Sequence, residues 1–512
     1  MHNALLIIVT LPLAAALLAL LVPPSRGRAF RRVAVAATGA ALALALTMFV
    51  AFDRQAAGFQ FGFTRPWLPD FGIAFSLGLD GVSLAAVLLA ALVAFAGALA
   101  ARDVRTREKE FWVLYLVLVS GAFGAFASTN LFFFYFFSEF EVLCAYLLIA
   151  GWGRLPEDDG RTDGASRAAM QMTLFVAAGA AATLLGLIAL YGYGGTFDWA
   201  LLRAALAAHP LPAPVQQTVF LLLLGGFGVL IAMWPLHAWT PPAYAAAPTA
   251  VSMFASGVLK QLGAYGLLRI ALPLLPEGAR HWAPLIAGLA IVNVLYAGWI
   301  ALRQTDWKYL IGYASISHAG YILLGIAAMN VVGLSGVALM IFAGGLATAL
   351  LFALAGCVEE AAGTREIAAF GGLGRQAPFI GVCTVMAAMA AVGLPGFAGF
   401  ASEVMVFVGG WMQGSIVARV AVAAGIWGLV LAATYMLRAV RAGVFGPMAT
   451  GAGKVADPRS PAGRLPYVLL LAALLAVGFV PRLLTDPIRR SVDSMMAAPR
   501  AAVTAQALTE KR

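Results

Sequence analysis

The feature that most limits what this chain can fold into is a series of long apolar runs that recur along almost the whole sequence. A helix needs about 20 apolar residues to cross the hydrocarbon core of a bilayer, because each residue adds about 1.5 Å to its length. Hydrophobic residues make up 62% of the chain and charged residues only 11%, whereas soluble domains carry about a quarter charged residues. The sequence therefore predicts an all-α polytopic membrane protein and excludes a soluble multi-domain protein.

Hydropathy along the chain predicts about fourteen transmembrane helices. The first run has no basic segment before it and no small-residue cleavage motif after it, so we interpret it as a retained span. Lys and Arg gather in the loops on one side of this arrangement, which predicts that those loops are cytoplasmic and that both termini lie on the outer face of a bacterial inner membrane. This placement also explains the net charge of +10 without nucleic-acid binding. The spans are expected near residues 4–23, 33–52, 82–100, 111–128, 130–151, 169–191, 217–237, 249–273, 282–302, 309–329, 333–357, 378–410, 417–437 and 464–481.

Helix-breaking residues interrupt two of the predicted spans, at Trp234-Pro235 in the seventh and at Gly393-Leu394-Pro395-Gly396 in the twelfth. Because five spans separate the breaks, helices 4–8 and 9–13 are expected to form two inverted five-helix repeats, a pattern typical of transporters. Gly and Pro are also common in membrane helices that have no such role. The predicted division is helices 1–3 in residues 1–110, the first repeat in 111–273, the second in 274–445, and the last helix with a basic tail in 446–512.

Ionisable side chains inside the spans are candidate functional residues, since each costs at least about 2.5–3.5 kcal/mol at the bilayer centre. Glu139 and Glu141 lie about 200° apart around a helix, so they cannot both face one partner. Glu139 is the favoured one, and Glu141 and His237 are weaker candidates. The structural alternatives are an ion pair for a glutamate, a fixed counter-ion for the lysine and a hydrogen-bonded core residue for the histidine. The principal set is Glu139, Lys260, His318 and Glu403.

A carboxylate, an amine and an imidazole can each take up and release a proton, so this set predicts a proton relay. Glu403 directly follows the second break, where unpaired backbone groups and water accommodate a charge, and it is expected to act as a gate. Asp306 and Lys308 are expected to be solvated loop charges. The three cysteines are scattered singly, as packing residues are. The sequence has no nucleotide-binding glycine loop, iron–sulfur cysteine set or haem motif, so we expect this chain to hold no cofactor.

Distinctive short strings follow one another along nearly the whole chain. In this order they resemble the chain M family of antiporter-like membrane subunits in the proton-pumping NADH:quinone oxidoreductase, complex I. The strings are Trp67-Leu68-Pro69, Leu77-Gly78-Leu79-Asp80-Gly81-Val82-Ser83-Leu84, Asn130-Leu131-Phe132-Phe133-Phe134, Met233-Trp234-Pro235-Leu236-His237-Ala238-Trp239, Ala247-Pro248-Thr249-Ala250, Gly263-Ala264-Tyr265-Gly266-Leu267-Leu268-Arg269, Gln304-Thr305-Asp306-Trp307-Lys308, Ser315-Ile316-Ser317-His318, Gly393-Leu394-Pro395-Gly396 and Phe445-Gly446-Pro447.

The resemblance implies a polar axis through the membrane, formed in the family by a fifth-helix glutamate, an eighth-helix lysine, a tenth-helix histidine and a twelfth-helix glutamate. Glu139, Lys260, His318 and Glu403 match these positions, and glutamate at 403 points to the M type because related chains usually have lysine there.

Two departures from the family pattern matter most for function. Leu230 stands where the family has the broken-helix lysine, and Gly344 stands where it has an eleventh-helix histidine. In the family that lysine pairs with the fifth-helix glutamate, so Glu139 is expected to lack its usual partner. Three readings follow: a proton-translocating subunit of complex I, a subunit of a cation/proton antiporter, membrane-bound hydrogenase or carbon-uptake complex, or a non-conducting structural spacer. All three imply other membrane-arm subunits and the lipid bilayer as partners, and any enzyme activity would belong to the complex.

Overall fold

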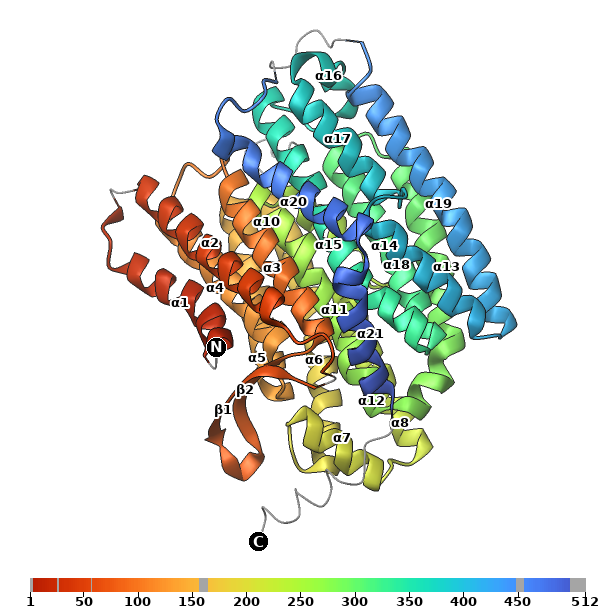
Figure 1. Cartoon of the computed structure of the whole chain (residues 1–512). Helices are drawn as coiled ribbons and strands as arrows, with labels where there is room; N and C mark the ends of the chain where they lie inside the picture. Colours follow the sequence, from red (N-terminus) through yellow and green to blue (C-terminus); the bar gives the residue numbers. More distant parts are fainter. Residues whose placement is uncertain (1–2, 25–26, 57, 156–163, 448–454, 498–512) are drawn as a thin grey trace.

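The computed structural model describes residues 3–24, 27–56, 58–155, 164–447 and 455–497, and most of them are helical (Figure 1). The predicted basic tail beyond residue 497 lies outside the described residues. The first helices are α1 (Ala4–Leu20), α2 (Gly27–Ala51), α3 (Gly81–Ala100), α4 (Glu108–Ala127), α5 (Leu131–Trp152), α6 (Gly164–Gly194), α7 (Trp199–Ala208) and α8 (Ala213–Leu230).

The middle of the chain contains the most interrupted helix of the protein. Two five-residue π-helical segments widen it. The first ends directly before Lys260, and the second includes Arg269. The elements of this part are α9 (Thr240–Ala246), α10 (Thr249–Phe254), η3 (Ala255–Leu259), α11 (Lys260–Gly266), η4 (Leu267–Ala271), α12 (Leu272–Leu274), α13 (Pro276–Arg303), α14 (Trp307–Ala328) and α15 (Val331–Ala362).

The last part of the chain contains the second predicted break, which separates α17 from α18. Its elements are η5 (Ile367–Phe370), α16 (Leu373–Gln376), α17 (Pro378–Ala391), α18 (Ala398–Met412), α19 (Ile416–Gly443), α20 (Pro461–Phe479) and α21 (Arg482–Met496).

Within the described residues, eleven helices are long and apolar enough to cross a membrane, or twelve if the bent pair Ile367–Gln376 and Pro378–Ala391 is one span. This confirms the polytopic helical fold, although the sequence predicts about fourteen spans. The other predicted spans are present as shorter or divided segments. The first forms the 17-residue α1, the eighth is divided by π-helical segments, and the twelfth is broken between α17 and α18.

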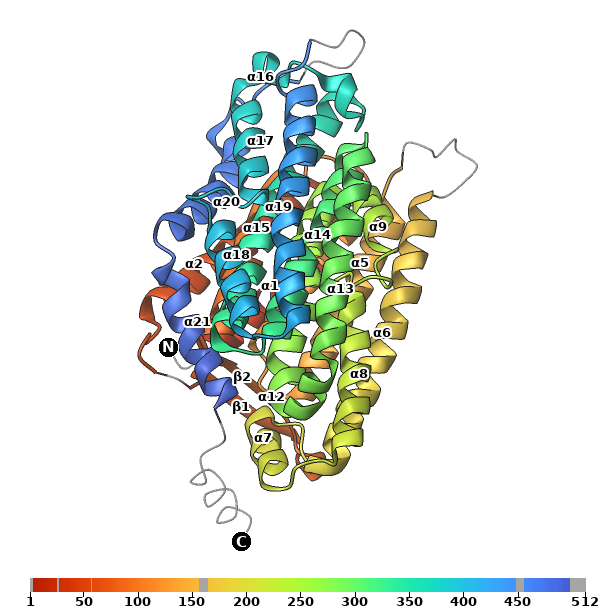
Figure 2. The same ribbon diagram turned by 90° about the vertical axis from the view of Figure 1, so that its right-hand side faces the viewer.

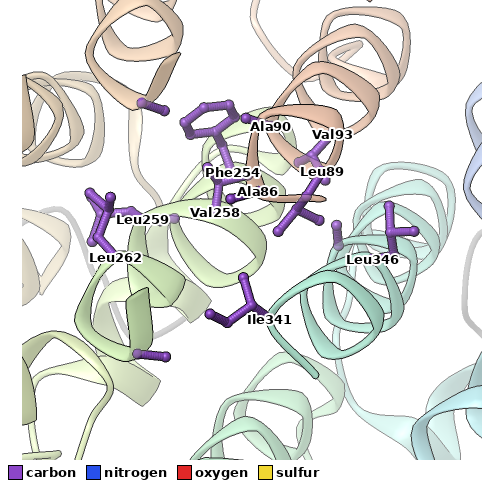
Figure 3. Close-up of a cluster of buried hydrophobic side chains, with 14 of the residues drawn as sticks. Ala86, Leu89, Ala90, Val93, Phe254, Val258, Leu259, Leu262, Ile341 and Leu346 are labelled. Carbon is purple, nitrogen blue, oxygen red and sulfur yellow. The ribbon is translucent and has the colours of Figure 1, made fainter. Parts of the chain in front are cut away.

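The centre of the molecule is built from α3, α14 and α15, whose side chains are almost all buried. Figure 3 shows where α3 meets the segment from α10 to α11 and α15: Leu89, Val258 and Ile341 pack together there. Small residues allow these helices to approach closely. A methyl group at Gly345 would overlap the backbone of Gly257, so glycine is required where α15 crosses η3.

A β-hairpin, which the hydropathy pattern did not predict, connects α2 to α3. Strands β1 (Gln60–Leu68) and β2 (Ile73–Leu79) pair antiparallel, with Thr64 opposite Ser76. The hairpin packs on the start of α5 through Trp67 and Phe133, whose rings lie 5.6 Å apart. Figures 1 and 2 place the hairpin and α7 at one end of the helices and α16 at the other.

The C-terminal helix α21 closes that same end by packing on α3 and α15. The backbone N–H of Gly81 donates to Ser491 Oγ at 2.7 Å, and a side chain at Gly81 would overlap the backbone of Pro487. Asp80 caps α3 and forms a buried ion pair with Arg269 at 2.6 Å. A charge pair buried this deeply needs every partner in place, so it holds the hairpin end in one arrangement.

Candidate functional site

Lys260 lies at the junction of η3 and α11, in the interior of the protein. Its side chain is buried, and its Nζ donates a hydrogen bond to the backbone carbonyl of Ser315 in α14. A π-helical turn opens the backbone and is frequent at functional sites. No carboxylate ion pair involves Lys260 among the described residues, so its partner is a backbone dipole rather than the counter-ion considered from the sequence.

His318 and Glu403 come together between α14 and α18. His318 Nε2 lies 3.8 Å from Glu403 Oε1, and Glu403 is 3% exposed. His318 Nδ1 lies 3.1 Å from the carbonyl of Ala314 in the preceding turn of α14. The separation between His318 Nε2 and Glu403 Oε1 is too long for a direct hydrogen bond.

The second helix break makes the space that Glu403 occupies. Gly393 adopts a φ of +76°, and a side chain at this position would overlap the carboxyl group of Glu403. Glycine tolerates this backbone conformation at no steric cost. The break thus does more than bend the helix, since it allows the carboxyl group to lie beside the backbone of the break.

A cavity of about 30 Å³ adjoins His318 and Glu403. Polar side chains from three helices line it: Ser315 of α14, Thr348 of α15 and Ser402 of α18. Gly344 also lines it, and a side chain added there would meet no atom closer than 3.9 Å. The cavity therefore lies at the position where the sequence departs from the family histidine.

The sequence favoured Glu139 over Glu141 as the functional glutamate of α5. In the structure Glu141 is the more deeply buried of the two. Glu141 is fully buried, and neither of its carboxyl oxygens has a hydrogen-bond partner within the described part of the chain. Glu139 is only partly buried. The helical period correctly predicts that the two residues lie on different faces of α5. Which of these faces points inward depends on how α5 packs.

The first helix break has a different composition. Leu230 ends α8, and Ala232 follows with a φ of +60°. Asn293 of α13 accepts a hydrogen bond from Trp234 N at 2.8 Å and donates to the carbonyls of Ala232 and Ile316 at 3.2 and 3.1 Å. Sequence reasoning missed Asn293, although a lone amide in the middle of an apolar run is a usable signal.

His237, a weaker candidate, contacts residues other than Lys260 and Glu403. Its ring packs on Tyr296 with centroids 5.4 Å apart, and its Nδ1 is buried without a partner among the described residues.

A polar pocket of about 430 Å³ opens at the end of the helices where the predicted cytoplasmic loops converge. Its Lys308 is buried and pairs with Glu359 at 2.8 Å, and the nearby Arg365 pairs with Asp306 at 2.9 Å. The expectation that Lys308 is a solvated loop charge is therefore wrong, because the end of α15 and the loop before α10 cover it.

Hydroxyl groups follow one face of the helix from this pocket toward Lys260. Asp103 accepts from Thr249 Oγ1 at 3.0 Å, Ser252 Oγ donates to Tyr244 O at 2.8 Å, and Ser256 Oγ donates to Ser252 O at 2.6 Å. The spacing of three or four residues places these hydroxyls above one another on the same face. Lys260, four residues beyond Ser256, ends this series.

Comparisons with known proteins identify the family to which this chain belongs. A profile described as NADH:quinone oxidoreductase/Mrp antiporter, TM, matches residues 128–428. NADH-quinone oxidoreductase subunit M of Rhodobacter capsulatus is 34% identical over 511 residues, covering 97% of each chain. A chain of respiratory complex I from Thermus thermophilus has a TM-score of 0.84 at 28% identity, with 96% of this chain and 100% of that chain covered.

A chain of the Mrp complex from a Dietzia species shares the fold, with a TM-score of 0.83 at 20% identity and coverage of 98% and 99%. The fold and site define a polytopic, antiporter-like membrane subunit. This chain belongs to the NADH:quinone oxidoreductase/Mrp antiporter transmembrane family.

Proposed function

We propose that this chain is a proton-translocating subunit of a bacterial inner-membrane NADH:quinone oxidoreductase, in which partner subunits carry out electron transfer. The observation that carries the proposal is that three ionisable groups gather around α14. Lys260 donates to the carbonyl of Ser315 in α14, and His318 of the same helix lies 3.8 Å from Glu403. The likeness to subunit M over almost the full length supports this assignment over other complexes. Other membrane-arm subunits would contact its sides, where large apolar residues of α6 and α19 are exposed.

Protons would enter from the cytoplasmic pocket, where Asp103 is hydrogen-bonded to Thr249. The hydroxyls of Thr249, Ser252 and Ser256 lead inward to Lys260, and a hydroxyl can accept one proton while it donates another. Lys260 would pass the proton toward α14, and His318 would exchange it with Glu403. Lys260 and Glu403 are buried, and His318 lines a small cavity together with Glu403.

We also propose that residues 111–273 and 274–445 act as two inverted repeats, and that only the second retains a complete proton-exchanging pair. His318 and Glu403 form that pair, whereas Leu230 occupies the corresponding break of the first repeat. A second function, a structural spacer that conducts nothing, draws its support from Leu230 and from the unpartnered carboxyl group of Glu141.

The test is the substitution Glu403→Gln in the assembled complex within inverted membrane vesicles. The amide keeps the shape of the side chain but cannot exchange a proton, so proton pumping per NADH oxidised should fall strongly, since a lost acid–base group costs about 10²–10⁴-fold in its step. Glu277→Gln, an exposed carboxyl at the start of α13, is the matched control and should pump normally. Normal pumping by Glu403→Gln would favour the spacer.

A further inference from the structure

A groove of about 700 Å³ lies where the predicted cytoplasmic ends of α1, α4 and α5 meet. The helix α1 packs on α4 and lies at the edge of the molecule in Figure 1. The groove is lined by large apolar side chains that remain exposed, since Leu20 is 51% and Leu147 is 38% exposed. Exposed apolar walls of this kind mark a binding surface rather than part of the protein core.

The inner part of the groove is apolar. Val113 and Leu114 of α4 and Tyr146 and Leu147 of α5 form its walls. The wall on α4 extends over the five residues from Lys109 to Leu114, or about 7.5 Å at 1.5 Å per residue. A wall of this length covers the first part of an acyl chain, and tyrosine is common at the level where headgroups meet the hydrocarbon core.

Two cationic side chains are held in place at the mouth of the groove. Lys109 Nζ donates to the carbonyls of Leu20 and Val22 at 2.7 and 2.9 Å, which leaves one of its three donors free. The guanidinium carbon of Arg107 lies 4.7 Å from the ring centre of Trp152, and the ring nitrogen donates to a backbone carbonyl at 2.8 Å. Within the described part of the chain, no hydrogen bond or ion pair involves the Arg107 guanidinium. Its donors are therefore available to a phosphate group.

Glu110 adds a carboxylate to the same mouth. It is exposed, lies three positions after Arg107 and forms no ion pair among the described residues. A purely anionic headgroup would be repelled by this carboxylate. A headgroup that carries both a phosphate and an ammonium group finds an opposite charge for each, so the arrangement of charges favours a zwitterionic lipid.

We propose that this groove is a binding site for phosphatidylethanolamine of the cytoplasmic leaflet. Arg107 and Lys109 bind the phosphate, Glu110 binds the ammonium group, and one acyl chain lies between α4 and α5. The lipid then fills the space between α1 and the rest of the protein. None of these charged residues belongs to the proposed proton route, so the site stands or fails independently of the proposed function.

Photo-crosslinking to the intact complex tests the site. The probe is phosphatidylethanolamine with a diazirine in one acyl chain, added to vesicles that contain the complex, and mass spectrometry maps the crosslinked peptides. Wild type should be labelled in residues 109–114 and 146–152. Arg107→Gln should reduce this labelling at least about fivefold, because it removes charge-assisted hydrogen bonds to the phosphate. Arg303→Gln, at an exposed arginine that ends α13, is the matched control and should be labelled as wild type is.

A second variant tests the apolar part of the groove without changing its charge. Leu147→Trp fills the space where the acyl chain lies and should reduce labelling by a similar factor. Leu185→Trp on α6 is its control, since Leu185 is 57% exposed and lies outside the groove. Co-purification with partner subunits checks that each variant assembles, and the two variants test the site separately if one of them assembles poorly.

Competition with unlabelled molecules tests the headgroup. Phosphatidylethanolamine should compete about threefold better than phosphatidylglycerol, as an exposed charge pair allows, and Glu110→Gln should abolish this preference. Inorganic phosphate should not compete. Equal competition by phosphatidylglycerol in wild type would overturn the headgroup assignment, and displacement by inorganic phosphate would assign a site for a free anion instead. Labelling that persists in both Arg107→Gln and Leu147→Trp, or a wild-type groove that is unlabelled because a neighbouring subunit fills it, would overturn the lipid site.

Discussion

The two helix breaks differ in the ionisable side chain beside each: His237 lies within the first break, between α8 and α9, and Glu403 of α18 lies beside the second. The break between α8 and α9 is closed by the amide of Asn293, which binds backbone groups on both sides. The break between α17 and α18 instead accommodates the carboxyl group of Glu403 beside Gly393, next to a small cavity. Both arrangements satisfy the backbone that a broken helix exposes, as a membrane interior requires.

The comparison teaches that an interrupted helix does not by itself make a proton site. We propose that a break must also provide space and a group placed to exchange a proton. At the first break Leu230, which ends α8, is apolar, and His237 packs on the ring of Tyr296. The amide of Asn293 is neutral and carries no exchangeable charge. We therefore expect substitutions around the second break and Lys260 to affect proton transport and those around the first break to affect mainly stability.

After Glu403→Gln, the largest effect is expected for Lys260→Met, which keeps the length of the side chain but removes the amine. Because the amine is the buried group that contacts α14 from η3 and α11, proton pumping per NADH oxidised should fall by at least about tenfold. Assembly should be retained, since methionine is apolar and flexible enough to fill the same space. Vesicle pumping assays check this, and near-normal pumping would show that protons bypass Lys260.

A large effect is also expected for Gly393→Ala, because the added methyl group overlaps the Glu403 carboxyl group. Gly396→Ala is the matched control, since Gly396 also has a positive φ, of +99°, but its nearest neighbour is Phe479 at 3.7 Å. Both variants carry a backbone cost of about 1–2 kcal/mol. Only Gly393→Ala should lose most of its pumping, and equal losses would assign the effect to backbone strain alone.

A moderate effect on stability is expected for Asn293→Ala at the first break. The substitution leaves Trp234 N–H and the carbonyls of Ala232 and Ile316 without their partner. Each buried polar group left unpaired costs about 1–3 kcal/mol, so the Tm of the purified complex should fall. Thr434→Ala removes an exposed hydroxyl on α19 as a control and should leave the Tm unchanged. If Asn293→Ala keeps its Tm but stops pumping, the first break carries protons after all.

The smallest effect is expected for Glu139→Gln. Glu139 is partly exposed, and no ion pair involving it is present among the described residues, so pumping should stay within about twofold of wild type, as for most surface substitutions. The same substitution at Glu141 provides the contrast, because that carboxyl group is fully buried. Abolished pumping in Glu139→Gln would mean that a neighbouring subunit supplies the partner that Leu230 does not.

Hydropathy and residue spacing predicted a large part of this protein. The membrane class, most of the spans, both helix breaks and the burial of Lys260 and Glu403 follow from the sequence alone. These properties depend on the cost of placing each side chain or backbone group in lipid, and that cost is local to the residue and its immediate neighbours along the chain.

Only the tertiary structure decided which groups meet. The inward position of Glu141 depends on the packing of α5, the buried pair of Lys308 and Glu359 depends on the approach of α14 to the end of α15, and the cavity beside Gly344 needs walls from α14, α15 and α18. Residues that form these features are separated by tens of positions along the chain. Their meeting is set by helix packing in three dimensions, which a single pattern of hydropathy and helical period does not contain.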